Sequence, residues 1–250
     1  MRIVVAKDYE EMSGRAAKIV AGQIFVKPNS VIGLATGSTP LLMYKELIRI
    51  HLEDGLDFSE ITTFNLDEYI GLSADNINSY HYYMFDNLFR HINIKKENIF
   101  IPNGMASDIE RECKSFEENI RAKGGIDLQV LGIGNNGHIG FNEPDIKFEA
   151  TTHEVKLDEE TILANARFFE TIDEVPKLAI SMGIKTIMHA RKVVLLANGY
   201  GKAESLSKAL YGGITPEIPA SILQLHQDVT VVVDGECASF LKRLGDERIE

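Results

Sequence analysis

The sequence predicts an α/β fold, with a mostly parallel central sheet covered by helices on both faces. Short apolar runs typical of strands alternate along the 250-residue chain with longer amphipathic runs typical of helices. No Pro/Ser-rich linker or block of like charge marks a boundary, so one domain over residues 1–250 is expected. In such a fold ligands bind beyond the carboxyl ends of the strands. The loops at that edge are therefore where function is to be sought.

The amino-terminal half contains four strand–helix pairs. Asp8 is of a residue type that caps helices, and the apolar stripe that follows it ends at Pro28. Pro40 suits the first turn of the second helix. The strands are expected at residues 3–6, 30–34, 61–66 and 99–101, and the helices at 8–26, 41–52, 80–89 and 108–123.

The carboxyl-terminal half continues the alternation around one long segment. The apolar run at 126–131 has the length and composition of a buried strand. In the segment 144–176 only a helix, at 159–169, is expected. Further strands are expected at 178–181, 193–197 and 229–233, and further helices at 184–189, 202–211 and 236–244.

The composition restricts partners and compartment. A formal net charge of −11 argues against broad nucleic-acid binding and requires a local site for any anionic substrate. Cys113 and Cys237 lie far apart and outside any metal-ligand spacing, as expected of reduced thiols in a cytoplasmic protein. No signal peptide is evident, and no apolar run approaches the ~20 residues that span a bilayer. We therefore expect no membrane partner.

The loop at residues 33–40, Gly-Leu-Ala-Thr-Gly-Ser-Thr-Pro, joins a strand to a helix. It offers backbone N–H groups, hydroxyls and a helix amino terminus, which together suit a phosphate. The loop lacks the Gly-Lys-Ser/Thr of an ATP-type P-loop, which favours a phosphomonoester over a nucleoside triphosphate. A well-capped turn with no ligand is the alternative.

A pair of adjacent carboxylates, Asp67 and Glu68, follows the strand at 61–66. Carboxylates at the carboxyl end of a strand are placed like the catalytic bases of α/β enzymes. Because neighbouring side chains of an extended chain point in opposite directions, one should face inward and the other away. A solvated acidic turn is the alternative.

The loop at 131–145 is rich in glycine and follows the strand at 126–131. The spacing of Gly132, Gly134 and Gly137 matches the dinucleotide-binding fingerprint. That fingerprint requires a helix at the third glycine, and the residues up to Pro144 are a poor helix start. A plain turn with a surface histidine is a further alternative.

His138 and Glu143 are the side chains of this loop that are suited to catalysis. Histidine exchanges protons near neutral pH, and a nearby carboxylate orients its ring and favours the protonated form. No Gly-x-Ser-x-Gly nucleophile elbow is present, neither cysteine is beside the histidine, and no metal-ligand set is evident. Proton transfer is the chemistry that remains.

Five stretches of the sequence carry a family resemblance over nearly its full length. They are Gly-Leu-Ala-Thr-Gly-Ser-Thr-Pro at 33–40, Thr-Phe-Asn-Leu-Asp-Glu-Tyr-Ile-Gly-Leu at 63–72, Gly-Ile-Gly-Asn-Asn-Gly-His-Ile-Gly-Phe-Asn-Glu-Pro at 132–144, Ala-Asn-Ala-Arg-Phe-Phe at 164–169 and Ser-Ile-Leu-Gln-Leu-His at 221–226. The chain resembles the glucosamine-6-phosphate deaminases, also called isomerases, which are related in fold to 6-phosphogluconolactonases. The resemblance implies a modified Rossmann-like sandwich. It also implies conversion of D-glucosamine 6-phosphate and water to D-fructose 6-phosphate and ammonium, in amino-sugar catabolism, without a metal or organic cofactor.

The resemblance also implies catalytic roles. Asp67 corresponds to the base that takes the C2 proton of the open-chain sugar and returns it at C1. His138, assisted by Glu143, corresponds to the group that opens the pyranose ring. The family often has Asp where this chain has Asn136. An amide can orient the imidazole by a hydrogen bond but does not stabilise imidazolium as a carboxylate would, so Glu143 is expected to be the charged partner of His138.

Phosphate binding is assigned by the same resemblance. The expected phosphate ligands are Thr36, Gly37, Ser38, Thr39, Arg167 and Lys202. Taken alone, either cation is equally consistent with a solvated charge on a helix. The segment 145–176 carries Arg167 and is a candidate lid.

The sequence indicates less about regulation and oligomeric state than about catalysis. Some members of the family are hexamers activated by N-acetylglucosamine 6-phosphate at a basic site between subunits. Residues 151–156, Thr-Thr-His-Glu-Val-Lys, form no Arg/Lys cluster in that region. Among the possible states, monomer or homo-oligomer, we expect an unregulated form that is monomeric or weakly associated.

Two rival functions remain at this stage. A 6-phosphogluconolactonase would need an activated water near His138 but no C2 base. A non-catalytic sugar-phosphate sensor would need neither a base nor an acid, which the combination of Asp67, His138 and Glu143 argues against.

Overall fold

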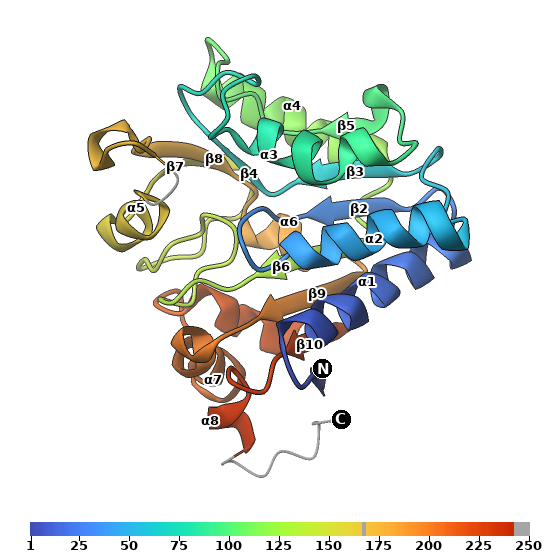
Figure 1. The fold of residues 1–250 in the computed structure, drawn as a ribbon. Helices are drawn as coiled ribbons and strands as arrows, with labels where there is room; N and C mark the ends of the chain where they lie inside the picture. Colours follow the sequence, from blue (N-terminus) through green and yellow to red (C-terminus); the bar gives the residue numbers. More distant parts are fainter. Residues whose placement is uncertain (167–168, 243–250) are drawn as a thin grey trace.

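A seven-stranded parallel sheet forms the centre of the protein, in the order β1-β10-β9-β6-β2-β3-β5 (Figure 1). The computed structural model describes residues 1–166 and 169–242. The strands of this sheet are β1 (Arg2–Val5), β2 (Val31–Leu34), β3 (Thr62–Asn65), β5 (Ile99–Phe100), β6 (Leu128–Gly132), β9 (Lys192–Ala197) and β10 (Val229–Val233). The predicted fold class, with its mostly parallel sheet, is confirmed.

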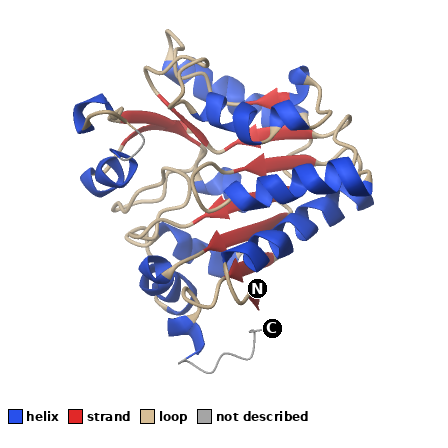
Figure 2. Ribbon diagram, viewed as in Figure 1, coloured by secondary structure: helices blue, strands red, loops and turns tan. Residues whose placement is uncertain are grey.

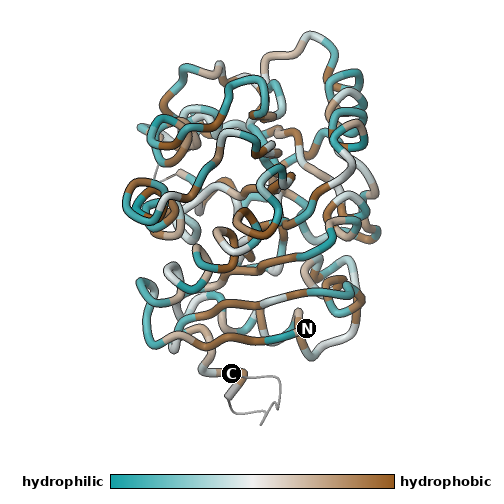
Figure 3. The backbone as a smooth tube through the Cα atoms, turned by 90° about the vertical axis from the view of Figure 1, so that its right-hand side faces the viewer, coloured by the Kyte–Doolittle hydropathy of each residue, from teal (hydrophilic) through white to brown (hydrophobic). Residues whose placement is uncertain are grey.

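Helices cover both faces of this sheet (Figure 2). They are α1 (Tyr9–Val26), α2 (Leu41–Asp54), α3 (Tyr80–Asn87), α4 (Ile109–Ala122), α5 (Glu159–Asn165), α6 (Ile184–Met188), α7 (Ala203–Tyr211) and α8 (Ser239–Lys242). One apolar core joins α1, α2 and α3 to one face through side chains such as Met12, Leu47 and Met84. The other core joins α4, α6, α7 and α8 to the opposite face, for example through Phe116 and Leu206. Hydrophobic stretches accordingly run through the interior in Figure 3 and hydrophilic stretches lie on its outer turns.

The helix starts follow the expected capping chemistry. Asp8 accepts a hydrogen bond from the backbone N–H of Glu11, and Asp108 accepts one from that of Arg111. These contacts satisfy amide groups that have no partner within the helix. The predicted helix at 236–244 is observed as the short α8, and residues 243 and 244 lie outside the described residues.

A second, antiparallel sheet with the order β4-β8-β7 was not predicted. It contains β4 (Asp67–Tyr69), β7 (His153–Lys156) and β8 (Leu178–Ser181). The prediction of an acidic loop from residue 67 was therefore wrong, because Asp67 begins a strand that pairs with Ser181. The segment 144–176 likewise contains β7 besides its helix, and α5 ends at Asn165 rather than at residue 169.

The second sheet lies beyond the carboxyl ends of the central strands, together with α5 (Figure 1). Tyr69 of β4, Phe141 of the loop after β6 and Ala179 of β8 share a small apolar cluster there. This cluster attaches the second sheet to the loops that follow the central strands. None of the described helices is long and apolar enough to span a membrane.

Candidate active site

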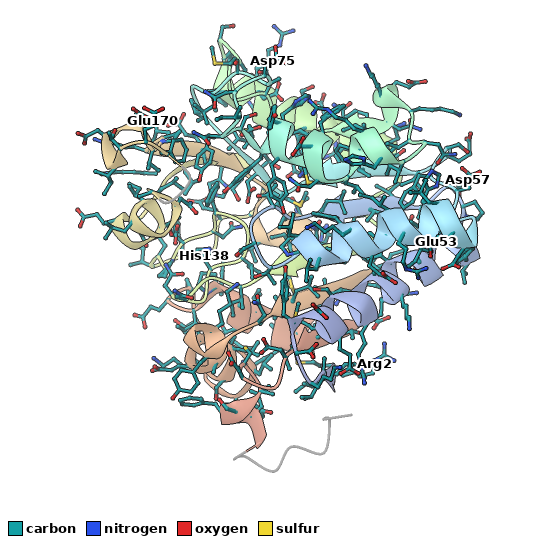
Figure 4. The ribbon with its side chains drawn as sticks, in the orientation of Figure 1. Arg2, Glu53, Asp57, Asp75, His138 and Glu170 are labelled. Carbon is teal, nitrogen blue, oxygen red and sulfur yellow. The ribbon has the colours of Figure 1, made fainter. Side chains whose placement is uncertain are left out.

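A cavity of about 520 Å³ lies at the carboxyl ends of four neighbouring strands of the central sheet, β9, β6, β2 and β3. Figure 4 shows His138 among the loops at this end, with Glu53 and Asp57 at the far end of the sheet. The predicted site residues that line the cavity are Thr36, Gly37, Ser38, Thr39, Asp67, Asn136, His138 and Lys202. The three loops selected from the sequence therefore do meet in one place.

Asp67 faces this cavity from the start of β4 and is only 6% exposed. Its burial raises the pKa of the carboxyl to about 8, and the neighbouring charge of Glu68 acts in the same direction. A carboxylate with a raised pKa is a stronger proton acceptor than one in water. The position and environment of Asp67 therefore suit a general base.

Glu68 points away from the cavity, as the alternation along an extended chain requires. Its carboxylate accepts hydrogen bonds from the backbone N–H groups of Tyr69, Tyr80 and His81, at 2.9, 2.9 and 2.8 Å. Burial raises the pKa of Glu68 to about 7, against the opposing effect of these hydrogen bonds. Glu68 thus ties β4 to the first turn of α3.

His138 and Glu143 form the predicted pair. The Nδ1 atom of His138 lies 3.1 Å from Oε2 of Glu143, whose side chain is 6% exposed. Burial opposes ionisation of Glu143, but contact with His138 and hydrogen bonds from Thr161 and Asn136 outweigh it and lower the pKa of the carboxyl. Glu143 is therefore suited to remain ionised beside the imidazole.

The side chain of Asn136 hydrogen-bonds to Glu143 and to the backbone of His138. Its Nδ2 donates to Oε2 of Glu143 at 2.9 Å, and its Oδ1 accepts from the backbone N–H of His138 at 3.2 Å. The amide therefore holds the carboxylate and the backbone of His138 rather than the ring. An aspartate here would bring a second negative charge against Glu143, whereas the amide supplies a donor.

The glycines of the loop after β6 make room for the histidine. A Cβ atom on Gly134 would lie 2.4 Å from Cε1 of His138, too close for any heavy-atom contact. Gly137 has a φ of +89°, which disfavours residues with a side chain. No helix follows Gly137, so the chain does not form the dinucleotide-binding turn that the glycine spacing resembles.

The residues predicted to bind phosphate in the loop after β2, and Lys202 just before α7, line the same cavity. Lys202 Nζ donates to Oγ1 of Thr39 at 2.7 Å, and that hydroxyl donates to Oδ1 of Asn198 at 2.9 Å. Gly37 has a φ of +98°, and its carbonyl accepts from the hydroxyl of Tyr83 at 2.6 Å. Arg167, the other predicted cation, lies outside the described residues.

Several residues of the cavity wall were not predicted. They are Tyr80, Phe141, Thr161, Asn165 and Asn198. Asn198 begins the Asn-Gly-Tyr-Gly stretch just before Lys202. Its position beside a predicted phosphate ligand could have identified it as a site residue. Phe141 belongs to the selected loop at 131–145 and Asn165 to the stretch at 164–169, whereas Tyr80 and Thr161 reach the cavity only through tertiary packing.

Metal ligation has no support in the described part of the chain. No group of three or more His, Cys, Asp or Glu side chains within residues 1–166 and 169–242 is arranged to hold an ion. Asp67 and the pair of His138 and Glu143 are placed to transfer protons.

Comparison with known proteins places these features in a family. The model of glucosamine-6-phosphate isomerases/6-phosphogluconolactonase matches residues 8–232. The chain is 62% identical over 241 residues to a glucosamine-6-phosphate deaminase of Clostridium acetobutylicum, covering 96% of this chain and 100% of the relative. It is 60% identical over 242 residues to one of Clostridium botulinum strain Langeland, covering 97% of this chain and 99% of the relative.

Solved structures agree with this result. A monomeric glucosamine-6-phosphate deaminase superposes with a TM-score of 0.94 at 52% identity, covering 96% of this chain and 100% of that one. The 6-phosphogluconolactonase of Trypanosoma brucei superposes with a TM-score of 0.76 at 20% identity, covering 96% and 98%, and shares the fold. By its sequence, its fold and the relatives it matches, the chain belongs to the family of glucosamine-6-phosphate isomerases and 6-phosphogluconolactonases.

Proposed function

We propose that this protein is a glucosamine-6-phosphate deaminase, which converts D-glucosamine 6-phosphate and water to D-fructose 6-phosphate and ammonium. One observation carries the proposal: a buried carboxyl and a histidine–carboxylate pair belong to the same cavity, Asp67 and His138 both lining it. The reaction requires two separate proton transfers, one at the ring oxygen and one between C2 and C1. The names of the relatives at 62% and 60% identity support the same substrate.

Ring opening is the first step. In the proposal, His138 moves a proton between the C1 hydroxyl and the ring oxygen, which frees the aldehyde. Glu143 stabilises the charged imidazole while the proton resides there, because its carboxylate lies 3.1 Å from Nδ1. Asn136 keeps that carboxylate in place from the other side.

Isomerisation and deamination follow. Asp67 removes the proton from C2, which the adjacent aldehyde acidifies. The electron pair forms the C1=C2 bond of an enolamine, and the aldehyde oxygen takes up a proton and becomes the C1 hydroxyl. Return of the proton to C1 gives an imine at C2, and water hydrolyses it to the ketone and ammonia, which leaves as ammonium. A positioned general base of this kind typically accelerates a reaction by ~10²- to 10⁴-fold.

The phosphate is assigned to the loop after β2 and the start of α7. Thr36, Ser38, Thr39 and Lys202 line the cavity, and the ammonium of Lys202 donates to the hydroxyl of Thr39. By family resemblance, Arg167 adds a second cation. Binding energy from this remote group serves to place C1 and C2 against Asp67.

The proposal also covers a lid, the oligomeric state and the compartment. The segment 145–176 acts as a lid, an idea supported by the position of Thr161 and Asn165 in the cavity wall. The protein is a monomer or a homo-oligomer, and the name of the structural relative favours the monomer. It is cytoplasmic, in keeping with Cys113 and Cys237 as buried free thiols.

The test is a direct comparison of two substrates. The protein is incubated with D-glucosamine 6-phosphate or with 6-phosphogluconolactone, in the presence of EDTA, and ammonium, fructose 6-phosphate and 6-phosphogluconate are measured. Equimolar ammonium and fructose 6-phosphate from the amino sugar support the proposal. Hydrolysis of the lactone without release of ammonium would sink it.

A further inference from the structure

The side chain of Thr161 contacts Glu143 of the catalytic pair from a different element, α5. Thr161 lies on α5 and is only 5% exposed. Its hydroxyl donates to Oε1 of Glu143 at 2.5 Å. This is the shortest hydrogen bond that the described residues give to Glu143.

The two oxygens of the Glu143 carboxylate are engaged by different elements. Oε2 lies against His138 Nδ1 and Asn136 Nδ2, which belong to the loop after β6. Oε1 contacts only Thr161 among the contacts identified for the described residues. The hydrogen bond from α5 therefore determines which way the carboxylate is turned.

The position of α5 gives this contact a further consequence. Thr161 and Asn165 are four residues apart on the helix, so both lie on one of its faces, and both line the cavity. When Thr161 is bonded to Glu143, the same helix face forms the wall of the cavity. The hydrogen bond thus couples the placement of that wall to the orientation of the ring-opening pair.

We infer that Thr161 is a positioning residue, whose hydroxyl holds Glu143 with Oε2 against His138 and docks α5 on the cavity. Thr161 donates a hydrogen bond to the carboxylate and takes no part in the bonds that the reaction makes or breaks. The inference rests on the proposed function, since the readout is deaminase activity.

The experiment compares Thr161→Val with Thr161→Ser. Valine has nearly the same shape but no hydroxyl, so kcat/KM should fall about tenfold, as expected for loss of one hydrogen bond to a charged group. Serine keeps the donor and should restore most of the activity.

Thr152→Val is the matched control. Thr152 is also 5% exposed and its hydroxyl donates to a glutamate, Oε1 of Glu117, at 2.7 Å, but it does not line the cavity. This variant loses an equivalent buried hydrogen bond. It should keep wild-type kcat/KM even though it unfolds at a lower urea concentration.

A double-mutant cycle separates positioning from general damage. If Thr161 acts through Glu143, the loss caused by Thr161→Val should largely disappear in a Glu143→Gln background. The same tenfold loss in both backgrounds would overturn the inference, as would a Thr161→Val variant within twofold of the wild type. Absence of ammonium release by the wild type itself would instead refute the proposed function.

Discussion

Asp67 and Glu68 are neighbours in sequence and face opposite sides of β4. Asp67 lines the cavity, whereas Glu68 accepts three backbone N–H groups, two of them from the first turn of α3. The alternation of side chains along an extended chain predicts that the pair divides in this way. It does not predict which of the two faces the substrate, because that depends on how β4 is placed relative to the central sheet.

The charge of Glu68 is expected to influence the base. Asp67 accepts a proton only when ionised, so activity should rise with pH as its carboxyl loses its proton. Glu68→Gln removes a negative charge that helps to raise the pKa of Asp67, so the acid limb of the plot of kcat/KM against pH should move to lower pH.

Glu117→Gln is the control for this variant. Glu117 also accepts three hydrogen bonds, from the backbone and hydroxyl of Thr152 and from Thr186, away from the cavity. Both variants should lose about 1–3 kcal/mol of unfolding free energy. An acid limb that stays in place or moves to higher pH in Glu68→Gln would contradict the assignment.

The sequence predicted which residues form the site better than it predicted the contacts among them. The pairing of His138 with Glu143 was predicted and is observed, because the loop is short and few other partners are within reach. The sequence left the hydrogen-bond partners of Asn136 open, since an amide can donate as well as accept and the sequence does not fix its orientation. The roles of Asp67, His138 and Glu143 stay predictions until they are measured.

At the scale of elements, the glycine-rich loop after β6 is shaped around the imidazole. The Cβ of an alanine at position 134 would lie 2.4 Å from the His138 ring. The ring must move to relieve this contact, and a displacement of about 1 Å at a catalytic group can cost ~10²-fold in rate. We therefore expect Gly134→Ala to lose ~10²-fold in kcat/KM while remaining folded.

Gly213→Ala provides the comparison, because a Cβ there meets no atom within 4 Å. This variant should behave like the wild type in the deaminase assay. Activity of Gly134→Ala within threefold of the wild type would show that the loop does not position the ring in this way.

The second sheet could not be predicted from the sequence. β4 has three residues and β7 four, and both are too short for an apolar period to be recognised. β8 was predicted as a strand, but its partners are antiparallel and lie outside the central sheet. Hydrogen bonding to distant segments, rather than local propensity, defines these strands.

At the scale of the whole molecule, the buried base should make stability depend on pH. The pKa of Asp67 is 3.8 in its ordinary environment and about 8 in the folded protein. The folded chain thus binds this proton more tightly than the unfolded chain, so the stabilising contribution is complete below pH 3.8 and is lost as the pH rises to about 8. Glu68 acts in the same direction up to about pH 7.

Asp67→Asn removes the contribution of Asp67 to this dependence. Between pH 5 and 8 the unfolding free energy of the wild type should fall more steeply than that of the variant, by up to ~1.4 kcal/mol per pH unit. Urea unfolding at each pH measures the two slopes. Equal slopes would contradict the raised pKa of the buried Asp67 carboxyl.

The eight predicted strands are all present, and the alternation of strands and helices was enough to predict a mostly parallel α/β fold. The strand order was not predictable, because several strands that pair in the sheet, such as β1 and β10, are far apart in sequence. β6, for example, lies between β2 and β9, which are 97 and 64 residues away by their first residues. Because β9, β6, β2 and β3 are neighbours in this order and run parallel, the loops that follow them meet at one edge of the sheet.

The central claim is that Asp67 is the base that moves the proton from C2 to C1. The most direct test measures ammonium and fructose 6-phosphate released from D-glucosamine 6-phosphate by the wild type and by Asp67→Asn, with EDTA present and folding verified by urea unfolding. We expect equimolar products from the wild type and a loss of at least ~10²-fold in kcat for the variant. A folded Asp67→Asn variant that releases ammonium at the wild-type rate would contradict the claim.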